Sequence, residues 1–441
     1  MKHGFFGIGN SNLGVYDYLS RHGELGEVTL RSDGEIPQSV LGDIRHDRVY
    51  EKQASLECLE EDVLFLSPSV RRDREGLRQA EARGVKLSSD LELFLEKRES
   101  LDYAITGSDG KSTTTHLIAA ILEASGIHAR PTGNYGVPLS TVIDTNEVSV
   151  AELSSFQLNF TSPKVRTAVI TGITPNHLNW HTSLEEYVSA KKRITEHAER
   201  VVADADSELM HAIVKEHELF AAVSTSLQFN ELSTHVKSEH YLTHRCGVIY
   251  LDSEPFIDVS GAMRHEVYNV KNYMLAAGAL LDTVSAEVSG EVVRGFKGLA
   301  HRAQLVAERG GIKYYDSSVD STPERTLATL RGLRGRNAVI IAGKGKRLSL
   351  FKLSEQLPRL SVGCVLMGEI GDELALLLSR KYGYKYVFAR DMQNAVKFAS
   401  ELLDGEGNVI LSPAGTSFDI YKNFEERGRA FCSAVQKTIE K

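Results

Sequence analysis

The segment AITGSDGKSTTT, residues 104–115, has the residue types of a phosphate-binding loop. An apolar strand leads into Gly107, Gly110 and Lys111 follow, and Ser112 begins a predicted helix. Backbone N–H groups and the N-terminus of that helix favour an anion, the lysine can reach the outer phosphates of a nucleotide, and a hydroxyl can bind Mg²⁺. The common loop has one more glycine, so a purely structural turn with a chance lysine stays an alternative.

Two further segments offer metal ligands. Glu152 follows the apolar run VSVA, at a point where a carboxylate can hold a hard cation. The segment NHLNWH contributes His177 and His181. Carboxylate and imidazole groups beside phosphates suit Mg²⁺ or Mn²⁺ better than a closed zinc site. Each residue taken alone could equally be a capping glutamate or a surface histidine.

The N-terminal segment GFFGIGNSNLG suggests a different cofactor. Its G-x-G turn after a short strand resembles a dinucleotide fingerprint, but Asn12 stands where a third glycine is usual. A nicotinamide-dependent dehydrogenase is therefore the alternative enzyme class.

Alternating strands and helices must position these groups, and the hydrophobic pattern predicts them. Apolar strands such as DVLFLSPSV, RTAVITG, NAVIIAG and NVILSPAG alternate with helical segments such as NVKNYMLAAGALLDTV and RGRAFCSAVQKTIEK. This alternation is typical of parallel α/β domains. A length of 441 residues suits two or three domains. We expect three in series: a Rossmann-like domain over residues 1–98, a P-loop ATPase domain over 99–299 and a Rossmann-like domain over 300–441.

The composition favours a cytoplasmic enzyme. The chain is 42% hydrophobic and 25% charged, and it has neither a long apolar run nor a signal-like N-terminus. Its four cysteines lack C-x-x-C spacing, so we expect neither a zinc site nor disulfides. A net charge of −8 disfavours non-specific binding of nucleic acid. We expect a monomer with no nucleic-acid or membrane partner.

Several segments occur in the order that is typical of Mur ligases. They are TGSDGKSTTT, GNYGVPL, ELSSFQL, ITPNHLNWHTSLEEYVSAKKRI, NVKNYMLAA, HRAQ and SPAGTSFDIYKNFEERGRAF. The chain resembles this family over essentially its whole length, and its last segment resembles the members that add D-glutamate. The family's own phosphate loop is the shortened G-x-x-G-K-S/T form. The resemblance implies that ATP phosphorylates the carboxylate of UDP-N-acetylmuramoyl-L-alanine, and that the amine of D-glutamate then displaces phosphate.

The resemblance also implies roles for individual residues around ATP. The phosphate loop would consist of Gly107, Ser108, Asp109, Gly110, Lys111, Ser112 and Thr113. Other nucleotide contacts would come from Asn272, with Asn269 nearby, and from Arg302 and Asp316. Ser112 and Glu152 would hold one Mg²⁺, and His177 would contribute to a second.

Lys191, in EEYVSAKKRI, matches a lysine that the family carbamylates. CO₂ converts its amine into an anion that can orient a metal, and this requires a deprotonated amine, which burial favours. The resemblance thus makes Lys111, His177 and Lys191 the catalytic group. The neighbouring Lys192 leaves the register open, and a simple basic helix face is the alternative.

Substrate contacts follow in the same way. The uridine diphosphate portion would contact Ser11, Asn12, Arg31, Ser32, Ser67 and Pro68, and Asn134 would lie near the reacting carboxylate. The amino acid would contact Lys346, Ser417 and Phe424. Two anionic ends of an acidic amino acid need donors at both ends.

Three positions depart from the family pattern. Many relatives read D-S-K-A-T-N where this chain has DSSVDSTPERT, so Ser318 replaces a lysine and Asp320 stands near a threonine position. Asn176 replaces a carboxylate close to the metal. An additional acid beside an acidic substrate is unfavourable unless it points elsewhere. L-glutamate or another acidic amino acid therefore stays open as the substrate. A folylpolyglutamate-synthase-like enzyme is disfavoured, because its members lack an N-terminal domain such as residues 1–98. A non-catalytic nucleotide-binding relative is the alternative from another class, and the retained set Lys111, Glu152, His177 and Lys191 argues against it.

Overall fold

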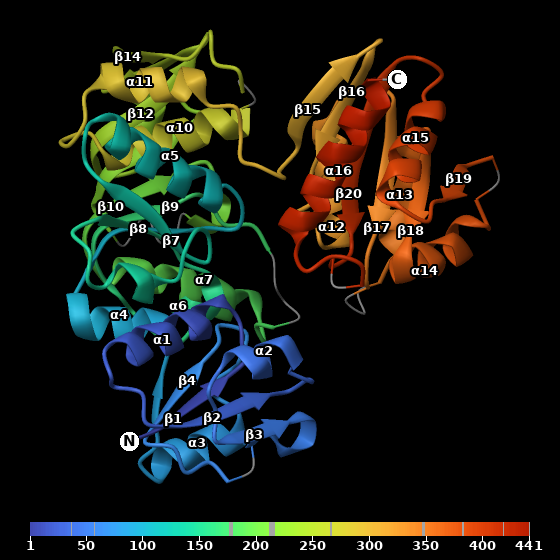
Figure 1. Cartoon of the computed structure of the whole chain (residues 1–441). Helices are drawn as coiled ribbons and strands as arrows, with labels where there is room; N and C mark the ends of the chain where they lie inside the picture. The colour runs from blue at the N-terminus through green and yellow to red at the C-terminus, as the bar shows by residue number, and fades with distance from the viewer. Residues whose placement is uncertain are drawn as a thin grey trace. The chain divides into compact units, whose positions relative to one another are not determined.

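The computed structural model of the chain describes residues 1–36, 38–56, 58–175, 180–210, 217–264, 267–345, 349–381, 383–417 and 419–440. The chain divides into two compact units, Met1–Phe296 and Lys297–Lys441. The first unit contains two β-sheets and the second contains one, which confirms the expected α/β class with three layered sheets (Figure 1). Within the described ranges, no helix is both long and apolar enough to cross a membrane.

The first sheet has five parallel strands in the order β3-β2-β1-β4-β5, the Rossmann-type order that the sequence predicts. The strands are β1 (Lys2–Phe6), β2 (Glu27–Ser32), β3 (Arg48–Glu51), β4 (Val63–Leu66) and β5 (Lys86–Ser88). The helices are α1 (Asn10–Arg21), α2 (Gln38–Asp43), α3 (Glu75–Ala82) and α4 (Asp90–Arg98), with a 3-10 turn η1 (Lys52–Leu56). Chain order changes direction between β1 and β4, so the turns after these two strands lie together at the carboxyl edge.

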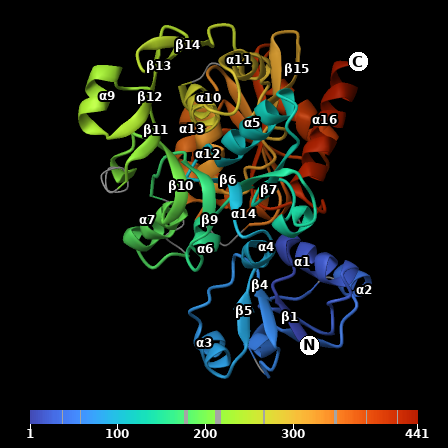
Figure 2. The same cartoon turned by 90° about the vertical axis from the view of Figure 1, so that its left-hand side faces the viewer.

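The second sheet has nine strands in the order β14-β13-β12-β11-β10-β9-β6-β8-β7. They are β6 (Leu101–Thr106), β7 (Ala129–Gly133), β8 (Val148–Glu152), β9 (Lys164–Ile170), β10 (His197–Asp204), β11 (Leu219–Ser224), β12 (Ser238–Arg245), β13 (Val248–Leu251) and β14 (Glu254–Asp258). Its helices are α5 (Lys111–Ala124), α6 (Ser155–Leu158), α7 (Leu184–Lys192), α9 (Phe229–His235), α10 (Val267–Ala279) and α11 (Ala286–Gly295), with 3-10 turns η2 (Leu139–Val142), η3 (Arg193–Thr195) and η4 (Glu208–Met210). Helices α5 and α10 pack side by side (Figure 2).

One part of this sheet departs from the expected parallel pattern. Strands β12, β13 and β14 form an antiparallel meander. The two connections are the pairs Cys246–Gly247 and Asp252–Ser253, and all four residues have positive φ. Two-residue turns of this kind match the twist of an antiparallel hairpin, so the chain reverses directly instead of crossing over through a helix.

The two sheets of the first unit pack through α1 and α4 against η2. The carboxylate of Asp90, at the start of α4, accepts hydrogen bonds from the backbone N–H groups of Leu139 (2.8 Å) and Ser140 (2.9 Å). A Cβ on Gly14 of α1 would lie 2.5 Å from Pro138 Cβ, so this helix needs a glycine to approach so closely. The hydrophobic core is continuous between the two sheets.

The third sheet has six strands in the order β15-β16-β20-β17-β18-β19, with helices on both faces (Figure 1). The strands are β15 (Gln304–Arg309), β16 (Ile312–Asp316), β17 (Asn337–Ala342), β18 (Gly363–Met367), β19 (Lys385–Phe388) and β20 (Gly407–Ala414). The helices are α12 (Pro323–Gly332), α13 (Phe351–Leu360), α14 (Gly368–Leu378), α15 (Met392–Glu401) and α16 (Phe424–Ile439). Strand β15 pairs antiparallel with β16, and the other neighbouring strands of this sheet pair in parallel. Separate apolar clusters fill the two faces, as a sheet covered by helices on both faces requires.

Candidate active site around the phosphate loop

The turn between β6 and α5 can be built only with glycine at two positions. Gly107 and Gly110 have φ of +145° and +86°. A Cβ on Gly107 would lie 2.0 Å from Thr171 Oγ1, and one on Gly110 would lie 2.4 Å from Asn272 Oδ1. Both conformation and space therefore exclude a side chain, and the backbone is free to curve closely around an anion at the start of α5.

Charge and helix direction at this turn favour phosphate. The amine of Lys111 donates to the carbonyl oxygens of Gly107 and Ser108, both at 2.9 Å, so it lies folded over the loop. The N-terminus of the 14-residue helix α5, with its positive dipole end, faces the same turn. Ser108 anchors the loop: its Oγ donates to Thr174 O at 2.8 Å and lies 2.7 Å from Tyr187 Oη. These features suit an anion at the turn, and the phosphate contacts of the loop residues stay predictions.

Glu152 lies beside this loop, as the sequence predicts. The pairing of β6 with β8 places Glu152 opposite Ile105, just before the turn. Its side chain is buried, and its two oxygens accept hydrogen bonds from Ser112 Oγ (2.6 Å) and Asn134 Nδ2 (2.7 Å). A buried carboxylate joined to a hydroxyl next to a phosphate loop is the oxygen-rich donor set that Mg²⁺ prefers, so these residues fit the ion.

Lys191 is buried against the same loop, whereas its neighbour Lys192 is half-buried. The Lys191 amine donates to Gly107 O at 2.6 Å and lies 4.8 Å from the ring centre of Tyr187. Burial, reinforced by the charge of Lys111, holds the pKa of Lys191 well below its ordinary value. A neutral amine is the form that can react with CO₂, so the geometry agrees with the register in which Lys191 is the modified lysine.

The two histidines of the sequence prediction differ. His177 lies outside the described residues. His181 is buried, its Nε2 lies 2.9 Å from Ser155 Oγ, and it packs edge-on against Trp180 and Tyr187. Burial lowers the pKa of His181. In the part of the chain that the structure describes, no three His, Cys, Asp or Glu side chains come together as a metal cluster.

Helix α10 brings two asparagines and a lysine behind the loop. Asn272 is buried, accepts a hydrogen bond from Thr114 Oγ1 at 3.3 Å, and lies against Gly110. Asn269 is also buried, one turn earlier. Between them, the amine of Lys271 lies 3.0 Å from an oxygen of Asp204 and 2.9 Å from an oxygen of Asp206, at the end of β10. This group of salt bridges was not predicted from the sequence, although the acids in VVADADS follow an apolar strand.

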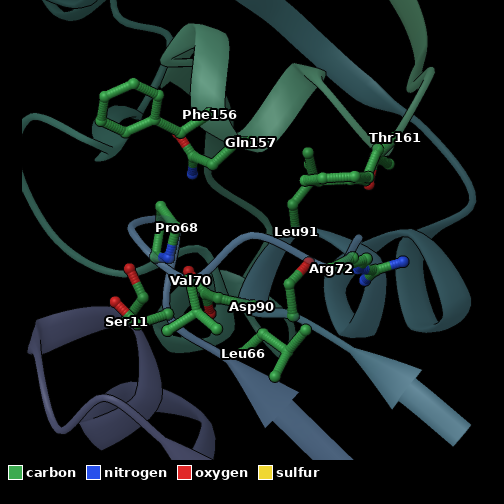
Figure 3. A pocket seen from close by; sticks show the side chains of 13 residues that line it. Ser11, Leu66, Pro68, Val70, Arg72, Asp90, Leu91, Phe156, Gln157 and Thr161 are labelled. Atoms are coloured by element: carbon green, nitrogen blue, oxygen red, sulfur yellow. The ribbon is translucent and has the colours of Figure 1, made fainter. Parts of the chain in front are cut away.

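Three residues predicted to contact the diphosphate and its rim line one pocket. Ser11 and Pro68 lie across the pocket from Phe156 and Gln157 of α6 (Figure 3), and Ser67 lines the same pocket. Serine hydroxyls on one wall and an aromatic ring on the other can hold a ligand with both polar and flat apolar parts.

Three other predicted contacts are engaged by the fold itself. The Nδ2 of Asn12 lies 2.8–3.1 Å from three backbone carbonyl oxygens after β1 and in β4. The guanidinium of Arg31 is fully buried, and its Nε donates to the Glu61 carboxylate at 2.7 Å. Ser32 Oγ accepts from the backbone N–H of Gly34 at 3.1 Å. In this conformation these side chains organise the sheet edge, and their contacts with a ligand stay predictions.

In the second unit, Asp316 ends β16 and is buried, with its Oδ2 2.6 Å from His301 Nδ1. Arg302, the next residue after that histidine, is half-buried. Lys346 lies outside the described residues. The proposed nucleotide contacts of Arg302 and Asp316 stay predictions.

The departure DSSVDSTPERT is explained by packing inside the second unit. Asp320 points inward: its Oδ2 accepts from Thr329 Oγ1 at 2.7 Å and from Ser412 Oγ at 2.8 Å. Ser318 Oγ donates to Phe424 O at 2.7 Å, at the start of α16. Arg427 Nε donates to Ser318 Oγ at 3.1 Å. A buried guanidinium therefore contacts Ser318, the position at which the family resemblance expects a lysine. The carboxylate of the additional acid is therefore held by hydroxyl groups of α12 and β20.

Ser417 follows β20 and is buried. Its carbonyl oxygen accepts from the backbone N–H groups of Ile420 (3.2 Å) and Tyr421 (2.8 Å), which closes a turn before α16. Ser417 and Phe424 thus flank one short connection, as a shared role at an amino-acid site would require.

Comparison with known proteins identifies the family of the chain. Residues 105–280 match the family model of the Mur ligase middle domain. The UDP-N-acetylmuramoylalanine–D-glutamate ligase of Clostridium beijerinckii is 32% identical, over 99% of this chain and 96% of its own length. The ligase of the same name from Ruminiclostridium cellulolyticum is 35% identical, over 85% and 82%. The crystal structure of a UDP-N-acetylmuramate–alanine ligase from Thermotoga maritima shares the fold with a TM-score of 0.62, at 20% identity over 99% of this chain and 100% of that one. The chain belongs to the Mur ligase family.

Proposed function

We propose that this chain is an ATP-dependent ligase that joins D-glutamate to UDP-N-acetylmuramoyl-L-alanine. The observation that carries the proposal is the convergence of Lys111, Ser112, Glu152 and Lys191 on one glycine turn. A protein that only bound a nucleotide would have no need of a buried lysine amine at the loop. The relatives named for this activity match along nearly the whole chain.

The chemistry follows from the substrates. A carboxylate is a poor electrophile at neutral pH, so one of its oxygens first attacks the γ-phosphorus of ATP, and ADP leaves. The nitrogen of the amino acid then attacks the carbonyl carbon of the acyl phosphate, the C–O bond to phosphate breaks, and the nitrogen loses a proton. Catalysis in such a transfer is mainly alignment and neutralisation of charge.

Lys111 and the N-terminus of α5 would hold and neutralise the outer phosphates of ATP. Ser112 and Glu152 would hold Mg²⁺, which would supply further positive charge to the phosphates. Lys191, as a carbamate, would place an anion beside the loop, and His177 would contribute to a second metal site. Asn272 would support the adenine side of the nucleotide from behind the loop.

The remaining substrates would bind at the other two sheets. The pocket of Ser11, Ser67 and Pro68 would hold the uridine diphosphate portion, and Asn134 would lie near the reacting carboxylate. Lys346, Ser417 and Phe424 would bind the amino acid. In this proposal residues 1–98, 99–299 and 300–441 are the three functional domains.

The experiment that tests this proposal is phosphate release by the purified protein. ATP, Mg²⁺ and UDP-N-acetylmuramoyl-L-alanine are supplied with D-glutamate, L-glutamate, D-aspartate or no amino acid. We expect release only with D-glutamate, because the relatives that match this chain along nearly its whole length are named for that amino acid. Release with a different amino acid would keep the ligase and change its substrate, and no release in any mixture would contradict the proposal.

A further inference from the structure

Arg71 joins the wall of the Ser11–Ser67–Pro68 pocket to helix α7. Its Nη1 donates to the carbonyl oxygen of Trp180 at 2.7 Å, and its Nη2 donates to Glu186 Oε1 at 2.9 Å. The guanidinium also lies 4.8 Å from the ring centre of Trp180. The indole of Trp180 in turn contacts the segment of Arg71: its Nε1 donates to Ser69 O at 3.0 Å. These contacts of Arg71 and Trp180 form a clasp, which joins the segment after β4 to the segment that enters α7.

The clasp is made of charged groups held in place. Both Arg71 and Glu186 are mostly buried, with side-chain exposures of 20% and 22%. Asp73 accepts from Arg71 Nε at 2.9 Å and fixes the plane of the guanidinium. Burial alone would raise the pKa of Glu186, but hydrogen bonds from Thr182 and Arg71 lower it to about 2, so this carboxylate is ionised at neutral pH. Charge-assisted bonds of this kind are strong and directional.

Helix α7 carries the contact on to the phosphate loop. Glu186 is in its first turn, where Ser183 Oγ accepts the Glu186 N–H at 3.2 Å. The next residue, Tyr187, places its Oη 2.7 Å from Ser108 Oγ, and Lys191 Nζ reaches Gly107 O at 2.6 Å. The helix lies at the end of the second sheet that is nearest the first sheet (Figures 1 and 2). One short helix therefore touches both the pocket side and the loop.

A ligand in the pocket would lie against the other side of this clasp. Val70 and Arg72, the two chain neighbours of Arg71, line the pocket (Figure 3). So does Phe156, whose ring is stacked on that of Trp180 with 4.3 Å between the centres. A ligand in the pocket would therefore touch residues that adjoin the clasp.

We propose that Arg71 is a positioning residue that couples the pocket to the phosphate loop, so that the UDP-linked substrate and ATP each bind more tightly when the other is present. The coupling runs from Arg71 through Glu186 and α7 to Ser108 and Gly107. This inference rests on the proposed function, because it takes the pocket as the seat of the UDP-linked substrate.

The test measures the dissociation constant of a non-hydrolysable ATP analogue with and without UDP-N-acetylmuramoyl-L-alanine. Couplings between sites are commonly about 5- to 150-fold. We expect the substrate to tighten analogue binding at least about 5-fold in the wild type. We expect no tightening in Arg71→Gln, whose affinity for the analogue alone stays unchanged. Arg74→Gln is the matched control, because Arg74 is in the same segment but pairs with Asp33 (2.8 and 3.0 Å) of the first sheet.

Two further measurements separate positioning from folding. Trp180 is the single tryptophan of the chain, so its fluorescence reports whether the substrate still enters the pocket. Arg71→Lys keeps the charge with fewer donors and should recover part of the coupling. If Arg71→Gln does not fold, Glu186→Gln and Arg71→Lys take its place in the comparison.

The outcomes distinguish this inference from the proposed function. Wild-type coupling retained in Arg71→Gln would overturn the role of Arg71 while leaving the ligase intact. A loss that is equal in Arg71→Gln and Arg74→Gln would also overturn it, because the effect would then belong to the whole segment. A wild-type protein that binds no UDP-linked substrate would overturn both the inference and the proposed function.

Discussion

Replacing Gly110 with alanine tests the geometry of the phosphate loop quantitatively. Gly110 has φ +86° and ψ −19° and is the residue that precedes α5. An alanine Cβ would lie 2.4 Å from Asn272 Oδ1 and 3.4 Å from Thr171 Cβ. Asn272 is buried and also accepts a hydrogen bond from Thr114, so its amide group cannot move without losing a partner.

The expected cost has two parts. An L-residue in the left-handed region costs about 1–2 kcal/mol. Displacing Asn272 removes a buried hydrogen bond, which costs about 1 kcal/mol more. We therefore expect Gly110→Ala to lower the free energy of unfolding by about 2–3 kcal/mol if the loop keeps its shape. If the loop changes its shape instead, the free energy of ATP binding becomes less favourable by the same amount, about 2–3 kcal/mol. This corresponds to an ATP affinity that is about 30- to 150-fold weaker.

Gly126 offers a matched control at the other end of the same helix. It also has φ +86°, but a Cβ there would meet nothing within 4 Å. Gly126→Ala should therefore show only the conformational cost and should keep wild-type ATP affinity.

Urea denaturation gives the stability, and titration calorimetry with a non-hydrolysable ATP analogue gives the affinity. Adding Asn272→Ala to Gly110→Ala should restore part of the stability. Equal losses of stability at both glycines, with normal ATP binding in Gly110→Ala, would refute the reasoning.

Three more predictions concern side chains around the site and in the second unit. Lys191→Ala should lose turnover and should regain part of it when a small carboxylic acid is added. Lys192→Ala should stay active. If the added acid restores no turnover to Lys191→Ala, a carbamate on Lys191 is contradicted. Asp320→Ala should lower the free energy of unfolding by about 1–3 kcal/mol, because the buried hydroxyl of Ser412 and the half-buried hydroxyl of Thr329 lose this acceptor. Amino-acid preference should stay unchanged, and an altered preference in the phosphate-release assay would place Asp320 at the substrate. The pKa of Glu186 falls from 4.5 to about 2 on folding, so its contribution to stability is complete above pH 4.5 and is lost as the pH falls towards 2. Acid denaturation followed by circular dichroism should therefore be less steep over this interval for Glu186→Gln, and identical curves would contradict this assignment.

The parts of the site that could be predicted are those whose signal is local. The glycines of the phosphate loop, its lysine and the flanking strand and helix follow one another directly, so strand-to-helix periodicity is enough to identify them. Glu152 is predictable because it is the polar end of an apolar strand. Parallel pairing of β6 with β8 then brings it to the loop without any further information.

Contacts that join distant segments were not predictable. The partners of Arg71 and Tyr187 lie 115 and 79 positions away in sequence, and no periodicity links such residues. The direction of Asp320 depends on two hydroxyls from α12 and β20, which the local pattern DSSVDSTPERT does not contain. Family resemblance assigned Asn12 and Arg31 to the substrate. Buried polar groups are usually hydrogen-bonded within the protein. Here the Asn12 amide donates to backbone carbonyl oxygens, and the Arg31 guanidinium donates to Glu61.

The antiparallel meander has a different cause. Strands at residues 238–258 were not among those predicted, and whether strands pair in parallel or antiparallel depends on the connections between them. Asp252–Ser253 is an uncommon pair for a two-residue hairpin turn, since asparagine and glycine are preferred there. Only the backbone conformation shows that the chain reverses at this point.

Transfer of oxygen from the carboxylate to phosphate is the most direct test of the account. UDP-N-acetylmuramoyl-L-alanine labelled with ¹⁸O in its carboxylate is incubated with the protein, ATP, Mg²⁺ and D-glutamate, and the released phosphate is analysed by mass spectrometry. If the carboxylate is activated as an acyl phosphate, each phosphate carries one oxygen from the labelled carboxylate, and release requires D-glutamate. Phosphate that contains no ¹⁸O, or that forms equally well without the amino acid, would contradict the proposed ligase.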